Sequence, residues 1–324
     1  MKTYFILKYL LKESAKKTIH RFAPNYINPT LVGKCSESAR YCYSVWLRHM
    51  VKAHENGLST YPKTIAELGP GNSLGIGIAA LISGCEKYYA FDVVKFANSE
   101  KNLEIFDEIV NLFVNRTPIP DNTEFPAIKP YLDNYDFPSN IFDEHRLKEA
   151  LNKKRLNIIR NAVSDKFQNN SIIQYKVPWD NTDIEKKEII DLIYSQAVLE
   201  HIDDLNNAYK SMYLWLKPAG YISHQIDYKS HSTAKYWNGH WTYSDIEWKI
   251  IRGMDKFLIN RVPHSVHLSM IKENGFHILC DKKVILPSVL CASELAPNYC
   301  SLLSEDLVTS GSFLQCSKID KRIS

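Results

Sequence analysis

A glycine-rich turn at residues 65–77 constrains the fold of this chain more than any other feature. The segment reads Ile-Ala-Glu-Leu-Gly-Pro-Gly-Asn-Ser-Leu-Gly-Ile-Gly, and a second apolar run, 76–82, follows the glycines. This order predicts a strand, a tight turn and the start of a helix, an arrangement that brings the backbone close to a nucleotide. Glycine suits such a turn because it adopts positive φ and has no Cβ to block a ligand. Many glycine-rich turns bind nothing, so the elements that follow must show whether this turn binds a nucleotide.

The next predicted strand, 88–92, ends in an acid, Asp92, 21 residues after Gly71. A carboxylate at this place can accept both hydroxyls of a ribose. The spacing Gly-x-Gly-x-x-x-Gly departs from the dinucleotide pattern, which has glycine where Leu74 stands, and no Gly-Lys-Ser/Thr is present for a triphosphate. Glu67, two residues before the first glycine, would repel a diphosphate. These residues favour a cationic nucleoside without phosphates.

Four motifs resemble those of the class I S-adenosylmethionine-dependent methyltransferases. Residues 67–71, Glu-Leu-Gly-Pro-Gly, are similar to the first family motif and Asp92 to the second. Val-Leu-Glu-His at 198–201 and Leu-Lys-Pro-Ala-Gly at 216–220 add to the resemblance, although Ala219 stands where glycine is more usual. The resemblance covers about 63–97 and 170–317. It implies S-adenosylmethionine as cofactor and an α/β fold, with a Rossmann-like seven-stranded, mostly parallel sheet and helices on both faces. The cofactor contacts it implies are Glu67, Leu68, Gly69, Pro70, Gly71, Asp92, Val93, Trp179, Asp180, Ser195, Gln196 and Ala197.

The apolar runs and their breakers predict how the chain is organised. The strands are expected at 65–68, 88–92, 171–177, 189–194, 221–226, 276–285 and 312–317. An N-terminal helical extension, 1–62, is expected to precede a methyltransferase domain, 63–324. Within that domain, the proline-rich segment 98–170 is interpreted as an insertion that forms part of a substrate lid, with surface decoration as the alternative. A charged helix is expected within it at about 143–159. Residues 227–265 are interpreted as the segment on the acceptor side.

Composition limits the partners and the compartment. The 40 basic and 36 acidic residues give a net charge of +4, too small to predict nucleic-acid binding without a local patch. The seven cysteines form no Cys-x-x-Cys pair, which favours reduced thiols in the cytoplasm. Residues 1–22 form a basic amphipathic helix, in which Lys8 interrupts the apolar run that a signal peptide would need. This helix either packs on the domain or lies peripherally on the inner face of a membrane.

Histidine and aromatic residues gather between 201 and 267, where six of the eleven histidines fall. Methyl transfer to a hydroxyl requires alignment of the acceptor and removal of its proton, for which histidine is suited. We expect His201 to be the base, with His224 in reserve; each could instead be a histidine that only satisfies a backbone group. The residues expected to contact the acceptor are Asp227, His231, Trp237, His240, Trp241 and Arg261. Arg261 could instead pair with a local carboxylate.

The predicted function is O-methylation of a small-molecule or glycan acceptor, with no nucleic acid and no metal. Two alternatives remain open. Some relatives bind a divalent ion through Glu-x-x-Glu-His, but here Gln196 replaces the first acid, so a metal-assisted enzyme acting on an RNA end is less favoured. The chain could also be a catalytically inactive, cofactor-binding partner protein.

Overall fold

A computed structural model describes residues 2–22, 34–95, 97–165, 169–179, 187–253, 255 and 257–319, without the side chains of 13–22, 34, 35 and 99. The strands form one seven-stranded sheet with the order β3-β2-β1-β4-β5-β7-β6. The first five strands are parallel, and β7 is antiparallel to both β5 and β6. The strands are β1 (Thr64–Leu68), β2 (Lys87–Phe91), β3 (Ile173–Lys176), β4 (Ile190–Gln196), β5 (Leu216–Asp227), β6 (Phe276–Ile285) and β7 (Thr309–Lys318).

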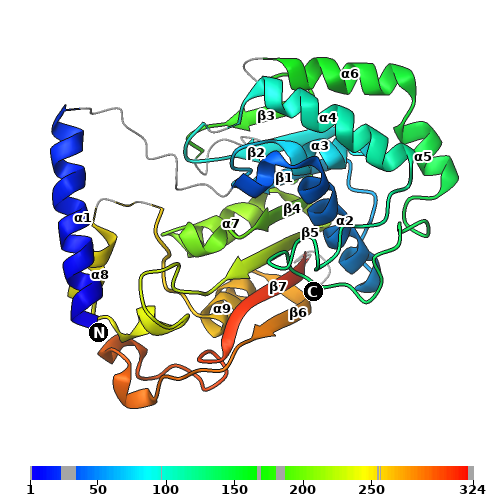
Figure 1. Cartoon of the computed structure of the whole chain (residues 1–324). Helices are drawn as coiled ribbons and strands as arrows, with labels where there is room; N and C mark the ends of the chain where they lie inside the picture. The colour runs from blue at the N-terminus through cyan, green and yellow to red at the C-terminus, as the bar shows by residue number, and fades with distance from the viewer. Residues whose placement is uncertain are drawn as a thin grey trace.

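Helices cover both faces of this sheet (Figure 1). They are α1 (Lys2–Phe22), α2 (Ala39–Glu55), α3 (Gly75–Ile82), α4 (Ser99–Val114), α5 (Glu144–Ala150), α6 (Lys153–Ser164), α7 (Leu205–Trp215), α8 (Asp245–Arg252) and α9 (His264–Glu273), with the short 3-10 turns η2 (Lys34–Glu37), η3 (Leu199–His201) and η4 (Gly239–Thr242). The predicted Rossmann-like fold is therefore confirmed. The boundary that differs most is the start of β5, which begins at Leu216 and not at 221. The Leu-Lys-Pro-Ala-Gly motif therefore lies within an irregular part of the strand, where Ala219 has a φ of 60°.

Alternation along the strands divides the core into two layers. Ile65, Tyr88 and Leu192 point to the face covered by α2, α3, α4 and α6. Ala66 and Ile193, one residue further along their strands, point to the face covered by α7 and α9. Because a parallel sheet is covered on both faces, its strands are nearly continuous apolar runs. This explains why the sequence located them well.

The helices of the segment 98–170 help to cover one face of the sheet. Helices α4 and α6 pack on each other and on α3. The single helix expected over 143–159 is two helices, because Asn152 interrupts it and accepts a hydrogen bond from Lys154 N as the cap of α6. Two parts of this segment approach the carboxyl ends of the strands. In the loop between α4 and α5, Lys129 O accepts a hydrogen bond from Gln196 Nε2 (3.4 Å), and in α4, Asn102 Oδ1 accepts one from Leu74 N of the glycine turn (2.9 Å). The lid expected of the segment 98–170 stays a prediction.

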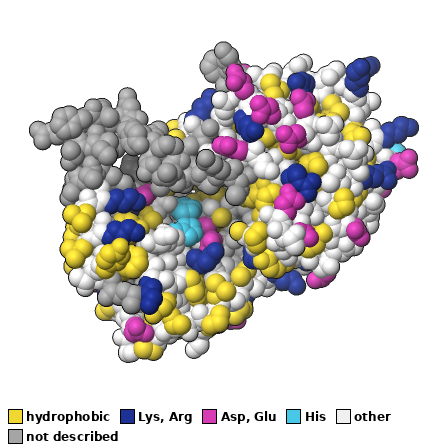
Figure 2. Space-filling model, in the orientation of Figure 1, with side chains coloured by type: hydrophobic (Ala, Val, Ile, Leu, Met, Phe, Trp, Pro, Cys, Tyr) yellow, Lys and Arg dark blue, Asp and Glu magenta, His cyan; other side chains and the backbone are white. Residues whose placement is uncertain are grey.

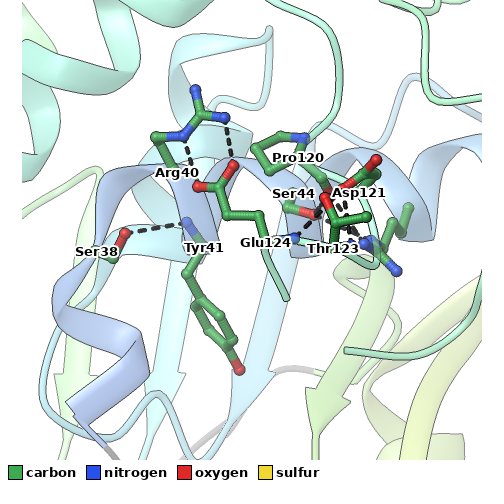
Figure 3. Close-up of polar contacts among 9 residues, drawn as sticks. Ser38, Arg40, Tyr41, Ser44, Pro120, Asp121, Thr123 and Glu124 are labelled. Atoms are coloured by element: carbon green, nitrogen blue, oxygen red, sulfur yellow. Dashed lines mark hydrogen bonds and ion pairs between the residues drawn. The ribbon is translucent and has the colours of Figure 1, made fainter. Parts of the chain in front are cut away.

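Helix α2 holds this loop in place through polar side chains (Figure 3). Arg40 makes two hydrogen bonds to the carboxylate of Glu124, at 2.6 and 2.5 Å, and Ser44 Oγ donates to Pro120 O (2.8 Å). One turn further along, the fully buried guanidinium of Arg48 donates to three carbonyl oxygens of the loop, those of Pro120, Ile128 and Pro130. The loop thus depends on a buried cation of a different element.

We expect Arg48→Met to lower the free energy of unfolding by at least ~3 kcal/mol, because three buried carbonyl oxygens would lose their donor at roughly 1–3 kcal/mol each. The matched variant Arg40→Met removes a half-exposed ion pair and should cost no more than about 1 kcal/mol. Urea unfolding followed by circular dichroism measures both. Equal, small losses for the two variants would show that Arg48 does not hold the loop.

Candidate active site

The glycine turn after β1 contacts the loop after β4. Gly69 has a φ of 64° and donates its N–H to Phe91 O (2.8 Å), so that it joins the ends of β1 and β2. A Cβ on Gly69 would lie 2.6 Å from Cγ2 of Val198, which follows β4. Glycine is therefore required by backbone conformation and by space. The glycine turn and the loop that contains Val198 thus pack against each other at the carboxyl ends of the strands.

No local pattern in the sequence indicated one neighbour of this turn, the short 3-10 turn η2. Ser36 Oγ accepts a hydrogen bond from Asn72 N (3.2 Å), and Glu37 accepts one from Asn72 Nδ2 (3.2 Å). Ser73 Oγ also donates to Ser36 O. These contacts join the N-terminal extension to the turn. The extension is thus part of the site and not only a lead-in to the first strand.

Asp92 stands beside the glycine turn with acceptor capacity to spare. Its carboxylate accepts hydrogen bonds from Gly71 N (3.2 Å) and Val93 N (2.7 Å), and its own carbonyl accepts one from Trp179 N (3.1 Å). Burial raises the pKa of Asp92 to about 6. A carboxylate has about four lone-pair sites, so the two hydrogen bonds leave room for two hydroxyls. This arrangement fits the ribose of a nucleoside.

Glu67 does not point into a cleft, contrary to the expectation that it meets the charge of the cofactor. Its Oε2 accepts hydrogen bonds from the hydroxyls of Tyr88 (2.5 Å) and Tyr194 (3.0 Å), and the residue is 2% exposed. A Cβ on Gly77 of α3 would lie 2.1 Å from the ring of Tyr88. Glu67 therefore holds β1, β2, β4 and α3 together. The side chain of Leu68 is also in the core, so only its backbone is at the turn.

The pH dependence of stability should reveal the buried Glu67. Burial raises its pKa from 4.5 to about 7, so between these pH values the folded protein binds more protons than the unfolded chain and loses stability as the pH rises. This rise in the pKa of Glu67 corresponds to ~3 kcal/mol of stability. We expect Glu67→Gln to lose about that much less stability than wild type between pH 5 and 8, by urea unfolding. Identical pH slopes would contradict the buried, protonated state.

The end of β4 is held by side chains and backbone. Gln196 Oε1 lies 3.4 Å from His49 Nε2 of α2, and Ala197, with a φ of 55°, donates its N–H to Gln225 O (3.0 Å). At the end of β3, the half-buried ring of Trp179 lies 5.8 Å from that of Phe91. Asp180, its predicted neighbour in the cofactor site, lies outside the described residues.

Two histidines meet above the carboxyl ends of β4 and β5. The ring of His201, in η3, lies 5.2 Å from that of His231. His231 Nε2 lies 3.5 Å from Asp227 Oδ2, and Lys229 Nζ lies 3.0 Å from the same oxygen. His231 and the next residue, Ser232, both have positive φ (44° and 64°), a strained conformation that is common at functional sites. Histidine reaches the surface, beside acidic and basic side chains, in the middle of the face drawn in Figure 2.

His201 and Asp227 differ in charge at neutral pH. Burial, together with the neighbouring His231, lowers the pKa of His201 to about 4, so His201 is neutral at neutral pH and a weak base. Burial tends to raise the pKa of Asp227, but the hydrogen bond to His231 and the charge of Lys229 hold that pKa below its ordinary value. Asp227 is therefore an anion that can orient an imidazole. His231, whose side chain is 30% exposed, is the histidine that an acceptor can reach.

The reserve base, His224, is contradicted by its position. It is fully buried within β5, and its Nδ1 lies 2.8 Å from Oγ of Ser195, which is also fully buried. Burial lowers the pKa of His224 to about 3. It lies between Ile222 and Ile226 on the face packed against α7 and α9, so it is a core histidine. Ser195 can meet a cofactor only through its backbone.

Three of the residues expected to bind the acceptor are structural. Arg261 donates to Tyr243 O (2.8 Å), pairs with Asp245 (3.0 Å) and lies with its guanidinium 4.7 Å from the ring of Trp248. Trp241 is fully buried and donates to Arg261 O, and His240 is 1% exposed. The local pairing of Arg261 thus holds, and not acceptor binding. Of the predicted set, Asp227, His231 and the half-buried Trp237 remain accessible.

Metal-ligating side chains do not converge in the part of the chain that the structure describes, where no group of three His, Cys, Asp or Glu could hold an ion.

One comparison with known proteins identifies a kind of domain within the chain. Residues 151–223 match the family model described as a methyltransferase domain. No curated protein matches the chain. Among solved structures, the chain is similar to an S-adenosylmethionine-dependent methyltransferase from Mesorhizobium loti, with 12% identity, 83% of this chain and 98% of that chain covered and a TM-score of 0.41. It is also similar to phosphoethanolamine N-methyltransferase 2 of Haemonchus contortus in complex with S-adenosyl-L-methionine, with 12% identity, 85% and 53% covered and a TM-score of 0.42. Nothing about the acceptor follows from such distant likenesses.

Proposed function

We propose that the chain, whose residues 151–223 match a methyltransferase-domain model and whose strands form a seven-stranded Rossmann-like sheet, is a class I S-adenosylmethionine-dependent methyltransferase that methylates an oxygen of a small-molecule or carbohydrate-like acceptor. One observation carries this proposal: an accessible histidine, His231, is paired with an ionised carboxylate, Asp227, at the carboxyl edge of the sheet. In open α/β sheets, ligands bind at this edge. A hydroxyl acceptor needs a base to remove its proton, and such a pair supplies one.

The cofactor is proposed to lie on the turn at Gly69 and Gly71, with its ribose hydroxyls on Asp92 and its amino-acid part on the backbone of 195–197. The spare acceptor capacity of Asp92, whose carboxylate accepts a hydrogen bond from Gly71 N of the turn, supports this placement. Pro70 lies in the glycine turn, Val93 follows Asp92, and Trp179 follows β3. All three are proposed as further contacts of the cofactor. When bound, S-adenosylmethionine supplies an activated methyl group. The protein's own part is to align the acceptor and to remove its proton.

The proton is proposed to pass to His231. Its Nε2 faces Asp227, so the Nε2–H would donate to that carboxylate and Nδ1 would be left to accept the proton from the acceptor hydroxyl. Asp227 then stabilises the imidazolium that forms. His201, whose ring packs against that of His231 and whose pKa lies at about 4, is proposed as a positioning residue. Half-buried Trp237 offers an aromatic face on which a sugar or phenol ring could stack.

Two measurements test the proposal. Calorimetry with S-adenosylmethionine and S-adenosylhomocysteine, with NAD as competitor, tests the cofactor site. Release of S-adenosylhomocysteine is then followed across pooled sugars, phenols and lipid-linked glycans, with and without a chelator. Turnover that survives the chelator supports the proposal, whereas turnover only with metal and an RNA end contradicts it. Cofactor binding without turnover on any pool favours an inactive partner protein.

A further inference from the structure

Helix α1 is attached to the body of the protein by one of its faces. Phe5, Ile6 and the buried Tyr9 pack against α8 and the segment before it, including Trp248 and Ile251. Lys2 Nζ adds an ion pair with Glu247 (2.7 Å) and a hydrogen bond to Thr242 O (2.8 Å). In Figure 1, α1 stands beside α8 at the left end of the molecule. The packing expected for a basic amphipathic helix is therefore present.

The opposite face of α1 is also apolar. Tyr4, Leu7, Leu10 and Leu11 are 64, 54, 44 and 73% exposed. At 100° per residue, Leu7 and Leu11 lie 160° from Tyr9, across the helix from the packed face. A helix on a protein surface normally has polar residues there, with a single apolar stripe facing the core. Packing on α8 thus explains one apolar face of α1 and leaves a second one without a partner among the described residues.

Positive charge accompanies this second apolar face. Lys8 and Lys12 are exposed between the two apolar faces, with their ammonium groups 5.8 Å from the ring of Phe5 and 5.4 Å from that of Tyr9 on the packed face. In sequence, residues 2–22 carry one acid, Glu13, and six Lys or Arg residues, namely Lys2, Lys8, Lys12, Lys16, Lys17 and Arg21. Figure 2 shows yellow apolar and dark blue basic side chains together at this end of the molecule. The surface is thus apolar and cationic at once.

We propose that this outer face of α1 docks onto an anionic membrane surface. A helix with exposed leucines and flanking lysines can lie in the plane of the lipid headgroups, where its apolar side chains are buried and its lysines meet anionic lipids. A second copy of the chain is a poorer occupant, because one helix face is small beside the roughly 800 Å² per partner of a stable interface, and lysines would face lysines. None of the described helices is long and apolar enough to cross the bilayer.

A cavity lies on the packed side of α1, one helix diameter (~10 Å) from the proposed docking face. It has a volume of about 380 Å³ and lies between α1 and the segment 234–243, and Phe5, Tyr236, Tyr243 and Leu290 are among its lining residues. The segment begins three residues after His231. The same end of the molecule therefore offers an apolar helix face, a partly apolar cavity and the proposed acceptor side. The docking itself does not depend on the identity of the acceptor.

Flotation of the full chain with phosphatidylcholine vesicles, with and without phosphatidylglycerol, tests the proposal. We expect wild type to float with the anionic vesicles only, and Leu7→Ser/Leu11→Ser to stay in the dense fraction. Lys8→Gln/Lys12→Gln should bind roughly 30-fold more weakly, at ~1 kcal/mol per lysine. The control Val114→Ser/Ile158→Ser alters two side chains, each 58% exposed, on α4 and α6, and should float like wild type.

Three outcomes would overturn the proposal. These are no flotation of wild type with anionic vesicles, equal loss in the control pair, and a dimer by light scattering that the α1 leucine substitutions dissociate. The last result would assign the face to a second copy. Circular dichroism of each variant shows that its fold is retained, since every substituted side chain is on the surface.

Discussion

Gly69→Ala should weaken S-adenosylmethionine binding by 100-fold or more, roughly 3 kcal/mol. The new Cβ would lie 2.6 and 2.8 Å from the two γ carbons of Val198, and the backbone at φ 64° disfavours any side chain. Relief of the contact has to move either the glycine turn or the loop after β4. Both belong to the proposed cofactor site, so the geometry of that site changes whichever of them moves. Calorimetry with S-adenosylmethionine and S-adenosylhomocysteine measures the loss.

The chain contains a matched control for this substitution. Gly57 has nearly the same φ, 69°, but no atom lies within 4 Å of the position of its Cβ. Gly57→Ala therefore has the same backbone cost, about 1–2 kcal/mol of stability, without any steric contact. We expect it to bind the cofactor like wild type. If both alanine variants bind equally, the contact between Gly69 and Val198 has no part in the cofactor site.

The sequence was informative wherever local pattern decides structure. The strand at 65–68, the glycine turn and the acid at Asp92 could all be found, because an apolar run, glycines that need positive φ and a strand end are local features. The interruption at Asn152 was missed although asparagine is a good helix cap, since the charged residues on both sides are equally compatible with one long helix. The contact of η2 with the turn joins segments over 30 residues apart, and no local pattern encodes it.

The errors in the site have a common cause, the direction of side chains. His224 and Glu67 both lie close to the carboxyl ends of their strands, and their position along the chain made each a candidate. Side chains alternate across a sheet, however, and the pattern Ile222, His224, Ile226 places the histidine on a packed face. The alternation was present in the sequence and could have excluded His224. The pairing of Arg261 with Asp245 arises from tertiary packing, so the sequence could only offer it as one of two interpretations.

The accessible base is the remaining question, and substitution of His231 answers it. We expect His231→Ala to lower kcat by 10²–10⁴-fold, the usual contribution of a general base, with cofactor affinity unchanged. Asp227→Asn should lower kcat as well, because the amide cannot stabilise the imidazolium. His145, on α5, has a side chain 81% exposed, and His145→Ala is the control that should leave kcat unchanged.

The same experiment separates His231 from His201, which the sequence favoured as the base. A phenylalanine keeps a flat ring but cannot accept a proton, so it can replace a positioning residue and not a base. We therefore expect His201→Phe to retain most of the turnover that His201→Ala loses, and His231→Phe to be as inactive as His231→Ala. The opposite pattern, with His231→Phe active and His201→Phe inactive over pH 6–9, would return the base to His201. Its pKa of about 4 argues against that outcome, because so weak a base takes a proton from a hydroxyl less readily than an exposed imidazole that a carboxylate supports.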